Sequence, residues 1–248
     1  MTDQKPTIVL VHGAFTEASS WNGVISHLHE HGVTAVAVAN PLRSLAGDAA
    51  YVRDVIASIP GPVVLVGHSY AGMIITEAAS QNSQVVALVY VNAFVPETGD
   101  SAFTLSASAP GSTLGDTLAA YPVATGGNEF AIRPELFHAQ FAADVAEAQT
   151  ALMAATQRPV TRAALSDSLT TERPAWKDIP SWHVFSDLDR NIPVAVLRAG
   201  AERASSRGTT EIAGASHATP VSQPGAIAAA IAEAGKAYLA SQTVNANA

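Results

Sequence analysis

The chain has 248 residues and a formal net charge of −8, and only 14% of its residues are charged against 48% apolar, so much of it is interior. The absence of cysteine excludes disulfides, thiolate metal sites and Cys nucleophiles, and a negative charge without a Lys/Arg cluster argues against nucleic acid and anionic membranes as partners. The longest apolar stretch, Val85 to Val95, is too short to span a membrane, and Met1 to Pro6 does not resemble a secretory signal, so we expect a cytoplasmic protein that acts on a small molecule.

Short apolar runs rich in β-branched residues recur along the chain between segments of helical periodicity. This alternation predicts parallel strands joined by crossover helices, and therefore an α/β fold. Nothing resembles a linker, so we expect a single domain over residues 1–248. The expected strands are Thr7 to Val11, Val33 to Val38, Val63 to Val66, Val85 to Val91, Trp182 to Phe185 and Thr209 to Ile212.

Helix signals lie between these runs. Ser19 or Ser20 is expected to cap a helix that ends at His31. Asp48 is the expected cap of the next helix, and the last helix begins near Pro224.

The interval from Pro96 to Pro180 is far longer than a simple crossover requires. Pro134 to Gln157 and Pro159 to Leu169 have helical periodicity. We therefore expect an insertion over about 96–180 that forms a helical cap above the carboxyl edge of the sheet, where open parallel sheets bind ligands. The alternative is a disordered excursion, which the Phe, Leu and Trp content of the segment disfavours.

The segment Gly67-His68-Ser69-Tyr70-Ala71 follows an apolar strand and precedes a helix. This pattern is typical of a nucleophile elbow, with Ser69 as the nucleophile. The turn is so sharp that the residues two before and two after the serine must be small. Gly67 satisfies this requirement, and Ala71 departs from the usual glycine by one methyl group.

A serine hydroxyl needs a base to remove its proton, and an imidazole suits that role. Of the eight histidines, His217 is the one that lies after the last strand, in the small-residue loop Gly214-Ala215-Ser216-His217. His183 lies inside a strand, where a core imidazole is the ordinary interpretation. The sequence therefore predicts His217 as the base.

The base needs a carboxylate to fix its tautomer. Asp187 and Asp189 both follow the strand Trp182 to Phe185, so both are candidates. Two N–H groups should bind the oxyanion: that of Tyr70, next to the nucleophile, and that of Ala14, in the loop after the first strand.

Together these motifs resemble the α/β-hydrolase superfamily over essentially the whole chain. His12-Gly13-Ala14 followed by Trp21, the elbow, and Gly214 to His217 are similar to bacterial esterases akin to plant methyl esterases and hydroxynitrile lyases. The resemblance implies a mostly parallel central sheet flanked by helices, with the cap between the family's sixth and seventh strands. It also suggests a homodimer. In that family the acid is the Asp of an Asp-x-x-Ile-Pro pattern, which implies Asp189 here and leaves Asp187 as the alternative.

We therefore expect a serine hydrolase that cleaves a small or medium carboxylic ester through an acyl-enzyme. The chemistry requires no metal or organic cofactor. The expected pocket lining comes mostly from the cap, with two residues from the first loop. The predicted pocket residues are Phe15, His12, Phe137, Phe141 and Trp176, with Phe103, Leu136 and Met153 beside them.

Other activities occur on the same scaffold, so fold alone does not decide the reaction. Hydroxynitrile lyases of this type carry a Lys after the catalytic His and a Thr after the first-strand His, where this chain has Ala218 and Gly13. Cyanohydrin cleavage is therefore disfavoured. A C–C lyase, a cofactor-free oxygenase or perhydrolase on the same triad, and a non-catalytic ligand-binding protein remain as alternatives.

Overall fold

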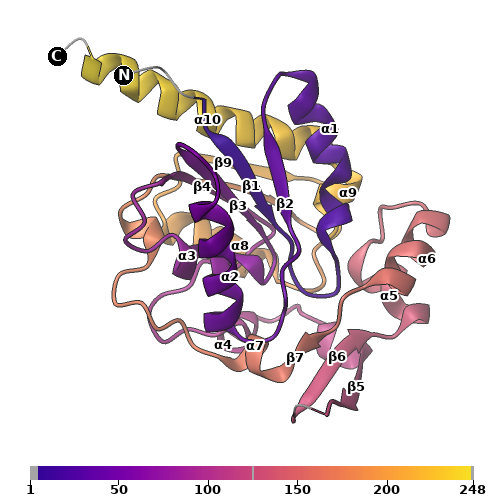
Figure 1. Ribbon diagram of the computed structural model, residues 1–248. Helices are drawn as coiled ribbons and strands as arrows, with labels where there is room; N and C mark the ends of the chain where they lie inside the picture. The colour runs from indigo at the N-terminus through magenta and orange to yellow at the C-terminus, as the bar shows by residue number, and fades with distance from the viewer. Residues whose placement is uncertain (1–4, 125, 247–248) are drawn as a thin grey trace.

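Six parallel strands form the central sheet of the computed structural model, which describes residues 5–124 and 126–246 (Figure 1). Their order is β2-β1-β3-β4-β8-β9. The strands are β1 (Thr7–Val11), β2 (Ala35–Val38), β3 (Val63–His68), β4 (Val85–Val91), β8 (Ser181–Ser186) and β9 (Gly208–Ile212). The α/β prediction is confirmed, and each expected strand agrees within two residues at either end. Residues 1–4, most of the segment read as lacking a secretory signal, lie outside the described residues.

Helices cover both faces of this sheet (Figure 1). On one face α1 and α10 pack against the strands, and on the other face α2, α3 and α8 do so. The bounds are α1 (Asn22–Glu30), α2 (Leu45–Ala57), α3 (Ala71–Ala78), α8 (Val194–Arg203), α9 (Thr219–Ser222) and α10 (Pro224–Ala246), with a 3-10 turn, η1 (Ala18–Trp21), before α1. Among the described residues, no helix is both long and apolar enough to cross a membrane.

Strand β3 shows why the central strands are apolar throughout. Val63 and Leu65 belong to the core on the α2 and α3 face, whereas Val64 and Val66 belong to the core on the α1 and α10 face. Successive side chains of a strand point to opposite faces, so a strand covered on both faces needs apolar residues at every position. The edge strands β2 and β9 are more exposed.

Two helix starts differ from the sequence-based expectation. Ser44 caps α2, because its backbone is extended and its Oγ accepts a hydrogen bond from Gly47 N at 3.2 Å. Asp48, the expected cap, lies one turn inside α2 and is fully buried. Ser19 and Ser20 do not cap α1 either, because both hydroxyls donate to Glu17.

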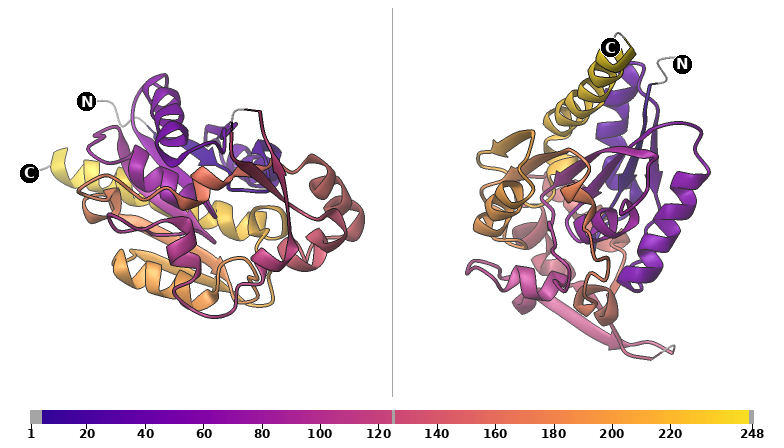
Figure 2. Two further views of the ribbon diagram at one scale, coloured as in Figure 1. Left: turned by 90° about the horizontal axis from the view of Figure 1, so that it is seen from below. Right: turned by 90° about the vertical axis from the view of Figure 1, so that its left-hand side faces the viewer.

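The segment between β4 and β8 is folded but is not purely helical. Its helices are α4 (Ala102–Ser106), α5 (Pro134–Phe141), α6 (Glu147–Thr156) and α7 (Arg162–Ser166), with 3-10 turns η2 (Leu114–Thr117) and η3 (Ala175–Lys177). It also contains a three-stranded antiparallel sheet of β5 (Leu118–Pro122), β6 (Asn128–Ile132) and β7 (Val160–Thr161), which the sequence analysis missed. Most of β5 is exposed, so it lacks the apolar pattern of a core strand. The small sheet and α5 and α6 project away from α10 (Figure 2).

Candidate active site

Ser69 sits in the turn between β3 and α3 with a φ of 59°, in the left-handed region that serine rarely adopts. Two backbone hydrogen bonds hold this conformation, from Ser69 N to Val91 O (3.1 Å) and from Gly72 N to Ser69 O (3.0 Å). Strain of this kind persists only where the surroundings impose it, and it concentrates at functional sites. The strand, the strained serine and the following helix have the local geometry that the elbow motif predicts.

Close backbone packing explains the small residues around this turn. A Cβ atom on Gly67 would lie 2.8 Å from Ala71 O, so the position two residues before the serine requires glycine. A Cβ atom on Gly72 would lie 2.1 Å from Phe94 O. The chain therefore accommodates a methyl group at Ala71 and requires glycine at the following residue.

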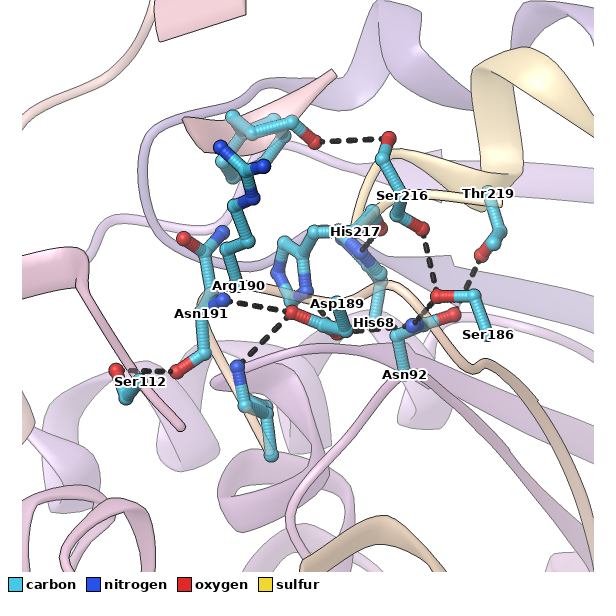
Figure 3. Close-up of polar contacts among 12 residues, drawn as sticks. His68, Asn92, Ser112, Ser186, Asp189, Arg190, Asn191, Ser216, His217 and Thr219 are labelled. Atoms are coloured by element: carbon cyan, nitrogen blue, oxygen red, sulfur yellow. Dashed lines mark hydrogen bonds and ion pairs between the residues drawn. The ribbon is translucent and has the colours of Figure 1, made fainter. Parts of the chain in front are cut away.

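His217 and Asp189 form a buried pair at the carboxyl edge of the sheet (Figure 3). His217 Nδ1 lies 2.6 Å from Asp189 Oδ2, and the two side chains are 1% and 0% exposed. An ionised carboxylate only accepts hydrogen bonds, so Nδ1 carries the proton and Nε2 has a free lone pair. Within the described part of the chain, Nε2 has no hydrogen-bond partner. His217 is thus held in the tautomer that can accept a proton.

Asp189 and Asp187 have different partners. Oδ1 of Asp189 accepts hydrogen bonds from the backbone N–H groups of Asn191 (2.8 Å) and Ile192 (2.9 Å). Asp187 instead accepts a hydrogen bond from Gly214 N at 2.7 Å, in the loop that leads to His217. Of the two candidate acids, Asp189 is the one that contacts the imidazole.

Further polar residues surround this pair, and the sequence analysis did not identify them (Figure 3). Asn92 Nδ2 donates to Asp189 Oδ2 (2.9 Å) and to Ser186 Oγ (2.7 Å). Thr219 Oγ1 donates to Asn92 Oδ1 (2.7 Å), and Ser186 Oγ donates to Ser216 O (2.7 Å). The sequence signal for Asn92 was its position as a polar residue directly after the buried strand β4.

His68 packs against the back of His217, with 4.7 Å between the ring centroids. Its Nε2 lies 3.0 Å from His217 O. Burial, reinforced by the neighbouring His217, holds the pKa of His68 well below its usual value. His68 is therefore neutral and adds no positive charge beside the base.

The loop after β1 approaches the serine closely. A Cβ atom on Gly13 would lie 2.6 Å from the Cβ of Ser69, so glycine is required there. The N–H groups of Ala14 and Tyr70 have no hydrogen-bond partner among the described residues. Phe15 N–H, by contrast, donates to Arg158 O at 3.2 Å. Ala14, in the loop that approaches Ser69, and Tyr70, the residue after it, thus each retain a free donor.

A cavity of about 380 Å³ opens beside Ser69. Residues at the carboxyl ends of the strands and residues of the insertion line it together. Among the residues that the structure describes, no Asp, Glu, Lys, Arg or His side chain lines it. The lining residues are Ala14, Phe15, Ser69, Tyr70, Phe94, Ala102, Phe103, Ser106, Ala107, Ala109, Pro110, Gly111, Ser112, Leu114, Gly115, Leu118, Leu165, Asn191 and Ile192. Of the residues expected in the pocket, Phe15 and Phe103 lie in this lining.

The structure places the other expected pocket residues outside the lining of this cavity, namely His12, Phe137, Phe141, Trp176, Leu136 and Met153. The rings of Phe137 and Phe141 stack with 5.0 Å between their centroids, and Phe141 and His217 form a T-shaped pair with 4.9 Å between theirs. Trp176 Nε1 donates to Pro96 O at 2.8 Å.

His12 is buried beneath the sheet edge. Its Nε2 accepts a hydrogen bond from Asn40 N at 3.1 Å, and burial lowers its pKa to about 4. For Phe137 and Phe141, by contrast, helical periodicity predicts burial but does not distinguish a core contact from a cavity wall.

Comparison with known proteins agrees with this geometry. The model of the alpha/beta hydrolase family matches residues 8–230. A carbendazim hydrolyzing esterase of Nocardioides sp. (strain SG-4G) is 35% identical over 113 residues, which are 39% of this chain and 46% of that protein. The matched segment spans about half the length of the curated relatives.

Solved structures show the same fold. Polyneuridine aldehyde esterase superposes with a TM-score of 0.79 at 22% identity, over 93% of this chain and 99% of that one. The methylesterase MES16 from Arabidopsis superposes with a TM-score of 0.77 at 17% identity, over 92% of this chain and 98% of that one. The expected likeness to esterases of the methylesterase type is thus confirmed at the level of the fold.

Proposed function

The chain belongs to the alpha/beta hydrolase family, and we propose that it hydrolyses a small or medium carboxylic ester through an acyl-enzyme on Ser69. The observation that carries the proposal is the buried contact between His217 Nδ1 and Asp189 Oδ2 (2.6 Å), which leaves His217 Nε2 free to take a proton. The similarity to a carbendazim hydrolyzing esterase over part of the chain supports the same reaction class.

In the first half of the reaction, Ser69 Oγ attacks the ester carbonyl carbon while His217 Nε2 removes its proton. The carbonyl oxygen becomes an oxyanion, which the N–H groups of Ala14 and Tyr70 stabilise. Asp189 stabilises the imidazolium that forms. When the tetrahedral intermediate collapses, His217 returns the proton to the departing alcohol oxygen, and the acyl group remains on Ser69.

In the second half, water replaces the alcohol. His217 Nε2 takes a proton from the water as its oxygen attacks the acyl carbonyl carbon. The same two N–H groups bind the second oxyanion. Collapse of this intermediate breaks the bond to Ser69 Oγ, which regains its proton from His217, and the carboxylic acid is released.

The position of the cavity supports an orientation for the ester. The cavity touches Ser69 and the two oxyanion donors, Ala14 and Tyr70, but His217 lies outside its lining. The alcohol oxygen must face His217 in order to receive a proton. The acyl group therefore occupies the cavity, and the alcohol leaves on the side of the imidazole.

The lining also supports a proposal for the chemical character of the acyl group. Its apolar side chains favour an apolar acyl group, and a charged group would lose its hydration without gaining an ion-pair partner. We therefore propose an uncharged, predominantly apolar acyl group.

Turnover of p-nitrophenyl acetate and butyrate by the purified wild type and by Ser69→Ala tests the proposal. We expect turnover that is lost in the variant, with circular dichroism unchanged. Absence of ester turnover in the wild type would contradict hydrolysis and would direct attention to the C–C lyase, oxygenase and binding alternatives.

A further inference from the structure

Asn92 occupies an unusual backbone position directly after β4. Its φ is 41°, it is fully buried, and its N–H donates to Val184 O at 2.8 Å. Asparagine is among the few residues that tolerate the left-handed region. The backbone thus anchors the residue to β8, the strand that leads to Asp189.

The side chain of Asn92 uses all of its principal hydrogen-bonding groups (Figure 3). One amide hydrogen goes to Asp189 and the other to Ser186. The amide oxygen accepts the hydroxyl hydrogen of Thr219, two residues beyond His217. One side chain therefore ties the loop of the acid to the loop of the base.

The network fixes the direction of this amide. Ser186 Oγ donates its hydrogen to Ser216 O, so it can only accept from Asn92. The ionised carboxylate of Asp189 also only accepts. A flipped amide would place its oxygen against two acceptors, so Nδ2 must face Asp189.

Asn92 and His217 donate to the same carboxylate oxygen. Asp189 Oδ2 receives His217 Nδ1 at 2.6 Å and Asn92 Nδ2 at 2.9 Å. The two backbone donors occupy Oδ1. With both oxygens held by donors, the carboxylate is fixed in its orientation toward His217.

We propose that Asn92 is a positioning residue of the active site, which holds Asp189 oriented toward His217 by donating to Oδ2. The inference rests on the proposed function, because it assigns to Asn92 a part in the reaction of Ser69. Asn92 does not line the cavity, so it acts through Asp189 and not on the substrate.

Several titratable or charged groups surround this amide. Asp189 contacts it directly, and His217 shares its acceptor. His68, from the end of β3, packs on His217, and Asp144 of the insertion accepts a hydrogen bond from Ser216 Oγ. Arg190, next to Asp189, donates to Ala139 O at 3.2 Å. Only Asp189 makes a direct side-chain bond to Asn92 among these groups.

The pH profile of Asn92→Asp tests whether the donor to Asp189 Oδ2 matters to the reaction. The substitution replaces the amide with a near-isosteric carboxyl group, and asparagine and aspartate both tolerate the positive φ. Two carboxyl groups this close share one proton, which they release only at raised pH, and its loss removes the donor to Asp189. The kcat/KM profile of the variant should therefore show an ionisation that the wild-type profile lacks. A profile that superimposes on that of the wild type would overturn the proposal.

The kinetics of Asn92→Gly test the loss of the donor without backbone strain, because glycine adopts a positive φ freely. A hydrogen bond to a charged group contributes enough for kcat to fall by about tenfold to a hundredfold. KM should stay close to the wild-type value, because the cavity is unchanged. A wild-type kcat would also overturn the proposal.

Tyr90→Phe is a matched control for the removal of a buried polar group from the same strand. Tyr90 lies two residues earlier, is 1% exposed, and its hydroxyl contacts Thr76 Oγ1 at 2.8 Å. Tyr90 is not part of the proposed machinery. We expect Tyr90→Phe to keep the wild-type kcat and pH profile, because the loss of a hydrogen bond far from the reacting groups does not change the pKa values that the profile reports.

The low-field proton NMR resonance of His217 Nδ1–H separates this proposal from the proposed function, because it requires no turnover. Asp189→Asn identifies the resonance by shifting or abolishing it. Asn92→Gly should change its chemical shift, and Tyr90→Phe should not. Wild-type protein without ester turnover would refute the proposed function. An active wild type whose resonance is unchanged in Asn92→Gly would refute the role of Asn92 alone.

Discussion

Asp189 accepts the Nδ1–H of His217 at 2.6 Å in a position from which solvent is almost completely excluded. The imidazole therefore depends on this one carboxylate for its tautomer and for stabilisation of its charged form. We expect Asp189→Asn to lower kcat by about 10³- to 10⁴-fold, because an amide at this position favours the wrong tautomer. Steady-state kinetics with p-nitrophenyl acetate measure the loss.

Asp187→Asn is the matched control for this prediction. Asp187 lies two residues away and bonds Gly214 N rather than His217. We expect this variant to retain most of its kcat. Equal losses in the two variants would show that the effect comes from the loop and not from the acid.

The close approach of Gly13 to Ser69 gives a second prediction. In Gly13→Ala the new Cβ would lie 2.6 Å from Ser69 Cβ, so the loop that carries the N–H of Ala14 must move. Removal of one oxyanion donor lowers kcat by about 10²- to 10³-fold, and we expect a loss of this size.

Gly115→Ala provides the comparison, because Gly115 also lines the cavity but a Cβ there meets nothing within 4 Å. Kinetics of both variants, with thermal unfolding to verify folding, check the prediction. Activity in Gly13→Ala equal to that in Gly115→Ala would argue against an oxyanion site in this loop.

The orientation of the acyl group gives a third prediction. Ala109 lines the cavity, so Ala109→Phe should fill part of it. We expect kcat/KM for p-nitrophenyl hexanoate to fall by about tenfold or more, while that for the acetate changes much less. Ser108→Phe changes an exposed neighbour outside the lining, so it should leave the ratio of the two kcat/KM values unchanged. An equal loss for both esters would place the acyl group elsewhere.

The buried His183 predicts a loss of stability in acid. Burial lowers its pKa from 6.5 to about 3. Between these two values the unfolded chain binds a proton that the folded chain does not, so stability falls as the pH drops below about 6.5. At pH 4.5 this difference in proton binding lowers the free energy of unfolding by about 3 kcal/mol.

The measurement is urea unfolding between pH 4.5 and 7.5, for the wild type and for His183→Phe. The variant keeps an aromatic ring against Tyr90, which stacks on His183 at 4.9 Å. We expect the free energy of unfolding of the variant to depend less steeply on pH, by about one proton. Parallel slopes would show that His183 titrates normally in the folded protein.

The central sheet was predictable because burial on both faces imposes a continuous apolar signature on each strand, as in Val63 to Val66. The elbow was predictable because the sharp turn constrains Gly67 sterically. The small antiparallel sheet could not be predicted, because its strand β5 is mostly exposed and has no continuous apolar pattern. Local sequence also failed to show that Ser44, and not Asp48, caps α2.

The residues of the candidate site also differ in whether the sequence predicts them. Ser69, His217 and Asp189 follow from motif order and from the resemblance to a family, whereas Asn92 depends on contacts between distant segments. Phe137 and Phe141 were expected in the pocket because an apolar helical face predicts burial, but it does not specify the partner. Tertiary packing places Phe141 against His217 and Phe137 against Phe141 instead.

The most direct test of the account is to quench the wild type during turnover of p-nitrophenyl acetate and to locate the acetyl group by peptide mass spectrometry. We predict a burst of about one equivalent of p-nitrophenol per active site and an acetyl group on the peptide that contains Ser69, both absent in Ser69→Ala. A burst that survives in Ser69→Ala, or an acetyl group on another residue, would contradict acyl transfer through Ser69.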